Sequence, residues 1–244
     1  TGGAGTARSA IRLFRAILNW GVIEGFVPKN IADAARYVDI GRDGKRETIL
    51  DDPQAYARLW GTLDTLVDQH RLRKPVADAI RVIALTGARR GEILDLRWSM
   101  VNLEKGIITL QIDAHKTGRK TGDVRIIGLP ILAQKIIQEQ PEGQFGDLVF
   151  QPSRSANRMD ISKPWRLIRS EAGLPECMGL HGLRHSLASR MAMEGAEAAE
   201  IMTTLGHRDI TTSQKYVHWA KSQRQDLAER AVASITAVIK ANES

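Results

Sequence analysis

One short alternating stretch limits how much β-sheet this chain can form. In residues 107–112 (IITLQI), Ile107 and Thr109 fall on one side of an extended strand, and Ile108 and Leu110 fall on the other. Residues 124–129 are the expected partner strand, across a loop rich in glycine and lysine. Elsewhere the apolar residues recur at helical spacing. The sequence therefore predicts a mainly α fold with a small antiparallel β-sheet, in the α+β class.

Helical patterns account for most of the remaining chain. Proline suits the first turn of a helix, and glycine takes the left-handed conformation that closes one, so these residues mark several boundaries. The expected helices cover residues 7–24, about 31–37, a segment from Pro53, a segment from Pro75 to Thr86, 89–96, a segment from Pro130, a segment around Trp165, helical residues from His181 to a stop at Gly206, and a segment from about Thr211. Thr211 and Gln214 have the form of a capping box, which indicates the start of this last helix.

Residues 38–48 (VDIGRDGKRET) separate two parts of the chain. The stretch is charged, contains two glycines and has no hydrophobic periodicity, which is typical of an interdomain linker. The two helices before it are too short to enclose a core of their own. They are expected to pack on the rest of the chain or on material that this sequence does not contain.

The charge balance is compatible with a polyanionic partner. Lysine and arginine number 35 against 28 aspartate and glutamate residues, an excess that favours nucleic acid binding but also serves solubility alone. No apolar run is long enough to cross a bilayer and no secretory signal opens the chain, so a cytoplasmic location without a membrane partner is expected. Cys177, the single cysteine, cannot form an internal disulfide and is expected to be a semi-buried structural residue.

Two basic residues stand where the chain changes direction. Arg89 follows the end of a predicted helix, and Glu92 lies one turn later. This pair is either a surface ion pair of little energetic value or part of a site. Lys116 lies where a predicted strand gives way to the glycine-containing loop, and Lys120 is a rival for any role there. Solvated loop lysines are common, so Lys116 alone indicates little.

Histidines and a tyrosine mark the last part of the chain. His181 and Arg184 are three residues apart and share one helix face. His181 and His185 have the four-residue spacing of a zinc-binding pair, but no glutamate stands between them and Arg184 would repel a dication, so no metal is expected. His207 directly follows the predicted turn at Gly206, which fixes the direction of its backbone. Tyr216 falls in the second turn of the next helix, where a single aromatic residue is more often part of a core.

In combination these residue types match the requirements of metal-free attack on a phosphodiester. Guanidinium groups bind the non-bridging oxygens and bind them more strongly as charge builds in the transition state. A phenol, with a pKa of about 10, needs a nearby base and cationic surroundings to become a nucleophile. The departing alkoxide needs an acid, which a positioned lysine can supply.

Four segments resemble, in order and spacing, the motifs of the tyrosine recombinases, the phage integrase family. The resemblance covers roughly residues 47–220 and implies the catalytic-domain fold of that family. The segments are TGARRGEIL (86–94), HKTGRKTGDVRIIGLP (115–130), HGLRH (181–185) and LGHRDITTSQKYVH (205–218). The catalytic residues that the resemblance implies are Arg89, Lys116, His181, Arg184 and His207 around the phosphate, with Tyr216 as the nucleophile.

The resemblance also implies a division of the chain. Residues 1–40 are similar to the C-terminal end of the family's helical core-binding domain, and residues 41–48 form the linker. Residues 49–244 form the catalytic domain, including a C-terminal helix. The expected partners are double-stranded DNA, other protomers of a homotetramer that exchange the C-terminal helix, and an accessory DNA-bending or directionality protein.

For activity, the resemblance implies a site-specific recombinase that integrates or excises a phage or mobile element without a cofactor. Tyr216 is expected to attack the scissile phosphate, leaving a 3′-phosphotyrosyl link and a free 5′-hydroxyl. Lys116 is expected to protonate the leaving oxygen, and His181 to take the tyrosine proton. Two alternatives stay open: a type IB topoisomerase-like nicking and closing enzyme, and a DNA-binding module that is catalytically inactive.

Overall fold

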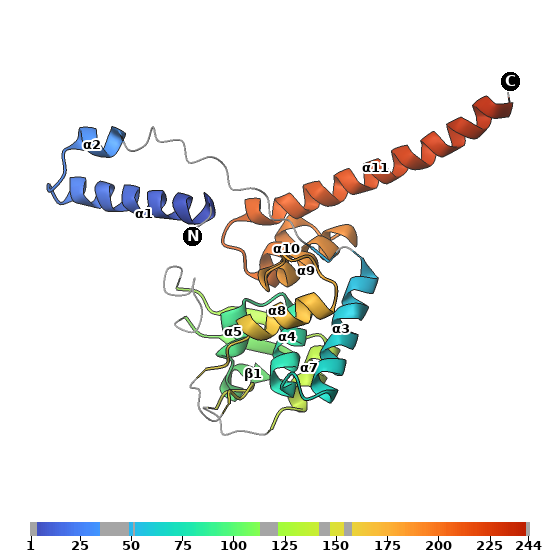
Figure 1. Ribbon diagram of the computed structural model, residues 1–244, viewed down its shortest axis with the longest axis horizontal. Helices are drawn as coiled ribbons and strands as arrows, with labels where there is room; N and C mark the ends of the chain where they lie inside the picture. Colours follow the sequence, from blue (N-terminus) through green and yellow to red (C-terminus); the bar gives the residue numbers. More distant parts are fainter. Residues whose placement is uncertain are drawn as a thin grey trace. The chain divides into compact units, whose positions relative to one another are not determined.

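The computed structural model describes residues 4–34, 49–50, 52–112, 122–141, 147–153 and 158–242 (Figure 1). The chain forms two compact units, residues 1–46 and 47–244. In the first unit, α1 (Ala4–Ile23) packs on α2 (Lys29–Ala34), and the Trp20 and Phe26 ring centroids lie 5.9 Å apart. The expected linker, residues 41–48, lies outside the described residues, so this boundary stays a prediction.

The second unit contains the other described elements. They are α3 (Pro53–Asp68), α4 (Lys74–Thr86), α5 (Arg90–Leu94), the 3-10 helix η2 (Trp98–Met100), β1 (Val101–Asn102), β2 (Ile107–Leu110), β3 (Arg125–Gly128), α7 (Ile131–Gln138), α8 (Ser162–Glu171), α9 (His181–Met193), α10 (Ala198–Leu205) and α11 (Ile210–Asn242). None of the helices in the described ranges is long and apolar enough to cross a membrane. The expected helix over residues 89–96 is shorter than predicted, because Arg89 caps it and Asp95 ends it.

The described sheet has three antiparallel strands in the order β1-β2-β3. Ile108 pairs with Val101 on one side and Ile127 on the other, and Leu110 pairs with Arg125. The two predicted strands are confirmed, although both end earlier than the alternation indicated. Strand β1 was not predicted, because two residues are too few to show a period of two.

The main core lies between the sheet and the helices of the second unit. Its largest fully buried side chains are Leu59, Leu63 and Leu66 of α3, Ile80 and Ile83 of α4, Ile93, Leu96, Ile108, Leu110, Ile127, Ile137 and Phe150. A separate cluster joins α9, α10 and α11 through Ala188, Ala192, Ile201, Leu205 and Ala220. Tyr216 packs against this second cluster. The three C-terminal helices therefore form a layer of their own, which Figure 1 shows in orange and red.

Two sequence expectations in this part of the chain are wrong. Helix α11 begins at Ile210, within one residue of the predicted start, but its cap is Asp209 rather than Thr211: the Asp209 carboxylate accepts a hydrogen bond from the Thr211 amide at 2.9 Å. An aspartate two residues before an amide is in the position to satisfy it, so Asp209 takes the role expected of Thr211. Cys177 is exposed rather than semi-buried, because the segment after α8 keeps its side chain at the surface.

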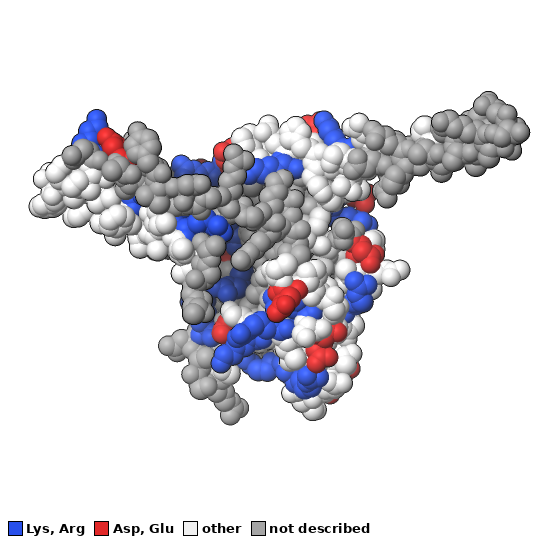
Figure 2. All heavy atoms as spheres, turned by 45° about the horizontal axis from the view of Figure 1, so that its top comes forward, with Lys and Arg blue, Asp and Glu red and all other residues white. Residues whose placement is uncertain are grey.

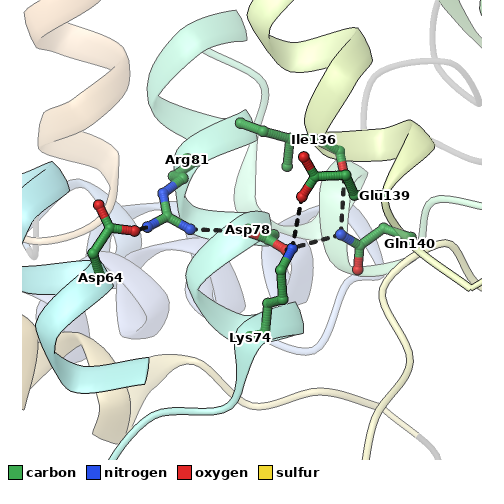
Figure 3. A network of polar contacts seen from close by, with 7 residues as sticks. All are labelled: Asp64, Lys74, Asp78, Arg81, Ile136, Glu139 and Gln140. Atoms are coloured by element: carbon green, nitrogen blue, oxygen red, sulfur yellow. Dashed lines mark hydrogen bonds and ion pairs between the residues drawn. The ribbon is translucent and has the colours of Figure 1, made fainter. Parts of the chain in front are cut away.

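A polar network, shown in Figure 3, connects α3, α4 and the end of α7. Asp78, which is 1% exposed, accepts hydrogen bonds from Arg81 at 2.8 Å, Lys74 at 2.8 Å and Gln140 at 2.9 Å. Arg81 also donates to Asp64 of α3 at 2.5 Å. The carboxylate of Asp78 is thus the common acceptor for two cations and an amide.

Replacing Asp78 with alanine should lower the free energy of unfolding by about 3 kcal/mol, because it leaves buried donors without an acceptor. The control is Glu171→Ala, which removes an exposed ion pair with Arg71 (2.8 Å) and should cost at most about 1 kcal/mol. Urea unfolding of both variants measures the difference. Equal, small losses would show that the network adds nothing to stability.

Candidate active site

The first arginine of the site is fixed by a buried carboxylate. Helix α4 ends at Gly87, which has the left-handed φ of 62°, and Arg89 then caps α5. The Arg89 backbone amide donates to Glu92 Oε2 at 2.8 Å, and Arg89 Nη1 donates to Glu92 Oε1 at 2.8 Å. The Glu92 side chain is 3% exposed. The pair is therefore a two-point contact on a buried carboxylate, with Arg89 itself partly exposed, and not a simple surface ion pair.

Three guanidinium groups from distant segments meet at the C-terminus of α10. Arg184 of α9 donates to Leu205 O at 2.6 Å and to Gly87 O at 2.7 Å. Arg89 donates to Gly206 O at 2.9 Å, and Arg125 of β3 donates to Leu205 O. The carbonyl end of a helix carries partial negative charge, so it attracts and orients these cations. One turn thus gathers residues from α5, β3 and α9.

Among the described residues, the three positive charges of this arginine cluster (Arg89, Arg125 and Arg184) exceed the negative charge that contacts them. Arg125 and Arg184 are 7% and 3% exposed, and Glu92 is the carboxylate that contacts the cluster, at 3.4 Å from Arg125 Nε. Burial and the neighbouring Arg89 and Arg125 lower the pKa of Arg184 to about 10. Arg125 Nε and Nη2 are buried without a hydrogen-bond partner. Buried cations in excess, with unused donors, favour the binding of an anion.

The histidines and the tyrosine lie beside this cluster. His181 begins α9, and its ring meets that of His185 edge-on, with centroids 4.5 Å apart. The His185 Nδ1 atom and the Tyr216 hydroxyl form a hydrogen bond between α9 and α11. The His207 ring stacks on that of Tyr216, with centroids 6.1 Å apart, and its Nδ1 lies 2.8 Å from the buried Ser213 hydroxyl.

His181 and His207 are neutral near pH 7. Desolvation and repulsion from His185, Arg184 and Arg89 lower the pKa of His181 to about 4, although the residue as a whole is exposed. Desolvation, followed by repulsion from Arg184, lowers the pKa of His207 to about 4. These rings therefore act as neutral hydrogen-bonding groups beside the arginines, and an anion bound there would raise both pKa values.

The structure brings together the predicted site residues that it describes. Arg89, Arg184 and His207 meet at the Leu205–Gly206 turn, and Tyr216 interacts electrostatically with Arg184. His181 lies one turn from Arg184 on the same helix. Lys116 and its rival Lys120 lie outside the described residues, so the lysine assignment stays a prediction. Within the described residues, no group of three or more His, Cys, Asp or Glu side chains forms a metal site.

Two site residues, Arg125 and His185, were not identified from the sequence. Arg125 stands in the buried register of β3, together with Ile127, while Val124 and Ile126 are exposed. The alternation of residues 124–129 puts Arg125 on the same strand face as Ile127. A charged residue on a strand face that is expected to be buried is a sign of a functional role, and it can be seen in the sequence. His185 was considered only as a zinc ligand, and its contact with Tyr216 depends on how α9 and α11 pack.

The turn at Gly206 should be intolerant of any side chain. Gly206 has φ 64°, and a Cβ atom there would overlap Arg125 Nη1. Gly206→Ala should therefore lower the free energy of unfolding by about 3 kcal/mol, combining left-handed strain with overpacking. Gly173→Ala is the matched control, since Gly173 has φ 61° with nothing within 4 Å of its Cβ position, and should cost about 1 kcal/mol. Urea unfolding compares them, and equal losses would contradict close contact with Arg125.

Comparison with known proteins decides the family. Residues 52–223, more than half of the chain, match the model of the phage integrase family. The chain belongs to the phage integrase family. The resemblance seen in the four sequence segments is thereby confirmed.

The related proteins of the phage integrase family include several recombinases. The chain is 28% identical over 152 residues to tyrosine recombinase XerD of Pseudomonas putida, which covers 61% of this chain and 51% of that protein. It is 29% identical over 165 residues to tyrosine recombinase XerA of Pyrococcus furiosus, covering 64% of this chain and 55% of the relative. The chain thus spans about half the length of these curated relatives.

Solved structures of integrases share the fold. The Tn1549 transposon integrase in complex with a circular intermediate DNA matches with a TM-score of 0.65 and 19% identity, over 91% of this chain and 79% of that one. The catalytic domain of bacteriophage HP1 integrase matches with a TM-score of 0.52 and 22% identity, over 75% of this chain and 94% of that one. These likenesses confirm the predicted fold: a mainly helical catalytic domain with a small antiparallel sheet.

Proposed function

We propose that this chain is the catalytic part of a site-specific recombinase that cleaves and rejoins double-stranded DNA through a 3′-phosphotyrosyl intermediate. The observation that carries the proposal is the arginine cluster of Arg89, Arg125 and Arg184, which has an excess of buried positive charge and lies beside the Tyr216 hydroxyl. A phosphodiester supplies the anion that this cluster lacks, and a phenol supplies an oxygen nucleophile. Family membership and recombinases such as XerD among the relatives support this reading.

The proposed reaction conserves the energy of the phosphodiester bond. The Tyr216 hydroxyl gives its proton to a neighbouring histidine and its oxygen forms a bond to phosphorus, while the bond from phosphorus to the 5′ oxygen breaks and Lys116 gives that oxygen a proton. Arg89 and Arg184 hold the non-bridging oxygens as charge builds. His181 and His207, both neutral at pH 7, donate hydrogen bonds from a ring N–H to the phosphate oxygens. The hydroxyl of a second DNA end then reverses the step, so neither a nucleotide nor a metal enters the scheme.

DNA binding is supported by the surface charge of the molecule. On the face drawn in Figure 2, Lys and Arg side chains form broad groups, and Asp and Glu side chains are more scattered. Such groups bind phosphates without reading the sequence, in a salt-dependent manner. The related Tn1549 integrase and XerH have been solved with DNA, which agrees with duplex DNA as the partner.

The remaining parts of the proposal concern assembly and biological setting. We place the core-binding remnant at residues 1–40 and the catalytic domain at 49–244. Helix α11 continues to Asn242, and Val232 on it is 60% exposed, so this helix suits docking on a neighbouring protomer of a DNA-bound homotetramer. Integration or excision of a phage or mobile element in the cytoplasm, with an accessory DNA-bending or directionality protein, completes the proposed role.

Covalent trapping on duplexes of random sequence tests the function and finds the DNA site in one experiment. The protein is incubated with a pool of such duplexes, each of which carries a nick at one fixed position. Cleavage a few nucleotides from the nick releases a short fragment, so the covalent complex cannot reverse. Denaturing washes, sequencing of the bound DNA and mass spectrometry of the attached peptide then identify the site and the residue.

The expected result is a nucleotide attached through its 3′ phosphate to Tyr216. Attachment at another residue would contradict the nucleophile, and DNA binding without attachment would leave an inactive DNA-binding module. The trapped sequence is then placed in supercoiled plasmids in one or two copies. Exchange between two copies supports recombination, whereas relaxation without exchange would identify a nicking and closing enzyme of the topoisomerase type.

A further inference from the structure

The Tyr216 hydroxyl is held by a residue to which neither the sequence motifs nor the comparisons give a role. Its hydrogen bond is with Nδ1 of His185, which follows Arg184 directly on α9. The two rings are tilted by 39°, with centroids 5.9 Å apart. His185 is half-buried, in the layer formed by α9, α10 and α11. The phenol that must lose its proton is therefore already hydrogen-bonded to an imidazole nitrogen.

His181, which the sequence resemblance presented as the proton acceptor, occupies a different place. Its ring lies edge-on to His185, on the side of α9 that carries Arg184. Burial, followed by repulsion from the positive groups around them, lowers the pKa of each of the His181 and His207 rings to about 4. A ring with so low a pKa takes a proton from a phenol only at a large cost, but it remains a good neutral hydrogen-bonding partner for a phosphate.

Building on the proposed function, we propose that His185 is the catalytic residue that orients the Tyr216 hydroxyl and accepts its proton. Neutral His185 carries its hydrogen on Nε2 and accepts the phenolic O–H through Nδ1. In cleavage the O–H bond breaks, an Nδ1–H bond forms, and the phenolate oxygen bonds to phosphorus as the bond to the 5′ oxygen breaks. The leaving oxygen takes its proton from Lys116. In rejoining, the proton on Nδ1 returns to the phenol.

A substrate that needs no general acid isolates this proton transfer. In the duplex recovered by trapping, the leaving 5′ oxygen is replaced by sulfur, because a thiolate departs without being protonated. Single-turnover trapping is then measured against pH for wild type, His185→Asn and the matched variant His181→Asn. Asparagine at 185 retains an acceptor near the position of Nδ1 but cannot take up a proton, so it separates orientation from proton transfer. His185→Ala removes both.

Among the described residues, the charged and titratable groups near His185 include His181 and Arg184 on α9, His207 before α11 and Tyr216 on α11. Wild type should show a rate that rises with pH to a plateau once His185 is neutral. His185→Asn should be about 10²- to 10³-fold slower at pH 7, with a rate proportional to hydroxide concentration. The His185→Asn variant should stay slow on the substrate with a sulfur leaving atom. The cleavage rate of Lys116→Ala, in contrast, should be restored on that substrate. His181→Asn should keep the plateau.

Several outcomes would overturn the proposal. A plateau that persists in His185→Asn, or one that is lost in His181→Asn, assigns the proton to another group. If wild type forms no covalent complex, the proposed function itself fails, so the two failures are distinguishable. Circular dichroism checks that the variants fold. Should both variants at 185 unfold, ¹⁵N NMR of the histidine rings in wild type and Tyr216→Phe decides: an unchanged His185 Nδ1 signal rejects the contact.

Discussion

Tyr216→Phe should abolish covalent attachment to DNA while leaving the fold and the DNA affinity intact. The substitution removes only the hydroxyl, because the phenylalanine ring still packs on the cluster formed by Leu205 and Ala220. The lost hydrogen bond to His185 should cost about 1 kcal/mol of stability. Loss of the nucleophile should slow trapping by at least about 10⁵-fold. Single-turnover trapping on the nicked duplex and a filter-binding titration measure both effects.

The matched control is Tyr56→Phe, a second tyrosine whose ring is half-buried against the core. Its hydroxyl interacts with Ser186 of α9, so this variant also loses a polar contact of a tyrosine hydroxyl. Trapping should be unchanged in Tyr56→Phe. If the variant at 56 loses trapping as the variant at 216 does, or if Tyr216→Phe still forms a covalent complex, then Tyr216 does not supply the attacking oxygen.

Arg184→Lys should slow cleavage by about 10³-fold although it keeps the charge. Arg184 reaches Gly87 O and Leu205 O with two different nitrogens and thus connects the α4 terminus to the α10 terminus. An ammonium group is one point charge and cannot hold both carbonyls together with a phosphate oxygen. The stabilisation that builds in the transition state is then lost, as on removal of an oxyanion donor. Affinity for DNA should change little, because it rests on many phosphate contacts.

A second buried arginine provides a control that should change stability without changing the rate of trapping. Arg81, 8% exposed, belongs to the network around Asp78 on α4 and has no place in the cluster at Leu205. Arg81→Lys should lower the urea midpoint but leave the rate of trapping unchanged. Trapping that falls equally in both variants would mean that Arg184 acts through stability. A normal rate in Arg184→Lys would remove this residue from the phosphate site.

The sequence predicts the fold well where local rules decide. Residues 107–112 and 124–129 alternate, and the strands β2 and β3 lie within these stretches. Glycine after a helical stripe marks the ends of α4 and α10, because left-handed backbone is required there. The predicted start of α11 lies within one residue of Ile210, but its cap is Asp209, whose carboxylate accepts a hydrogen bond from the Thr211 amide. Strand β1 depends on pairing with β2 and has no local signature.

The site is predicted less completely, because tertiary packing creates its properties. Arg89, Arg184 and Tyr216 were named through family resemblance, and nothing in their spacing alone requires them to meet. The burial of Glu92 follows from how α5 packs, so its ion pair with Arg89 looked like an ordinary surface pair. The contact of His185 with Tyr216 joins α9 to α11 across 31 residues. Local periodicity contains no information about such a contact.

The order of these segments along the chain has a consequence for synthesis in the cell. A ribosome produces Arg89, Arg125 and Arg184 before it reaches Tyr216, since α11 follows every segment that contributes a guanidinium group. Under the proposed function, the nascent chain therefore contains the phosphate-binding arginines before it contains the nucleophile. The proposed cleavage then has to wait until α11 has been translated and its first turns, which contain Tyr216, have packed on α9 and α10.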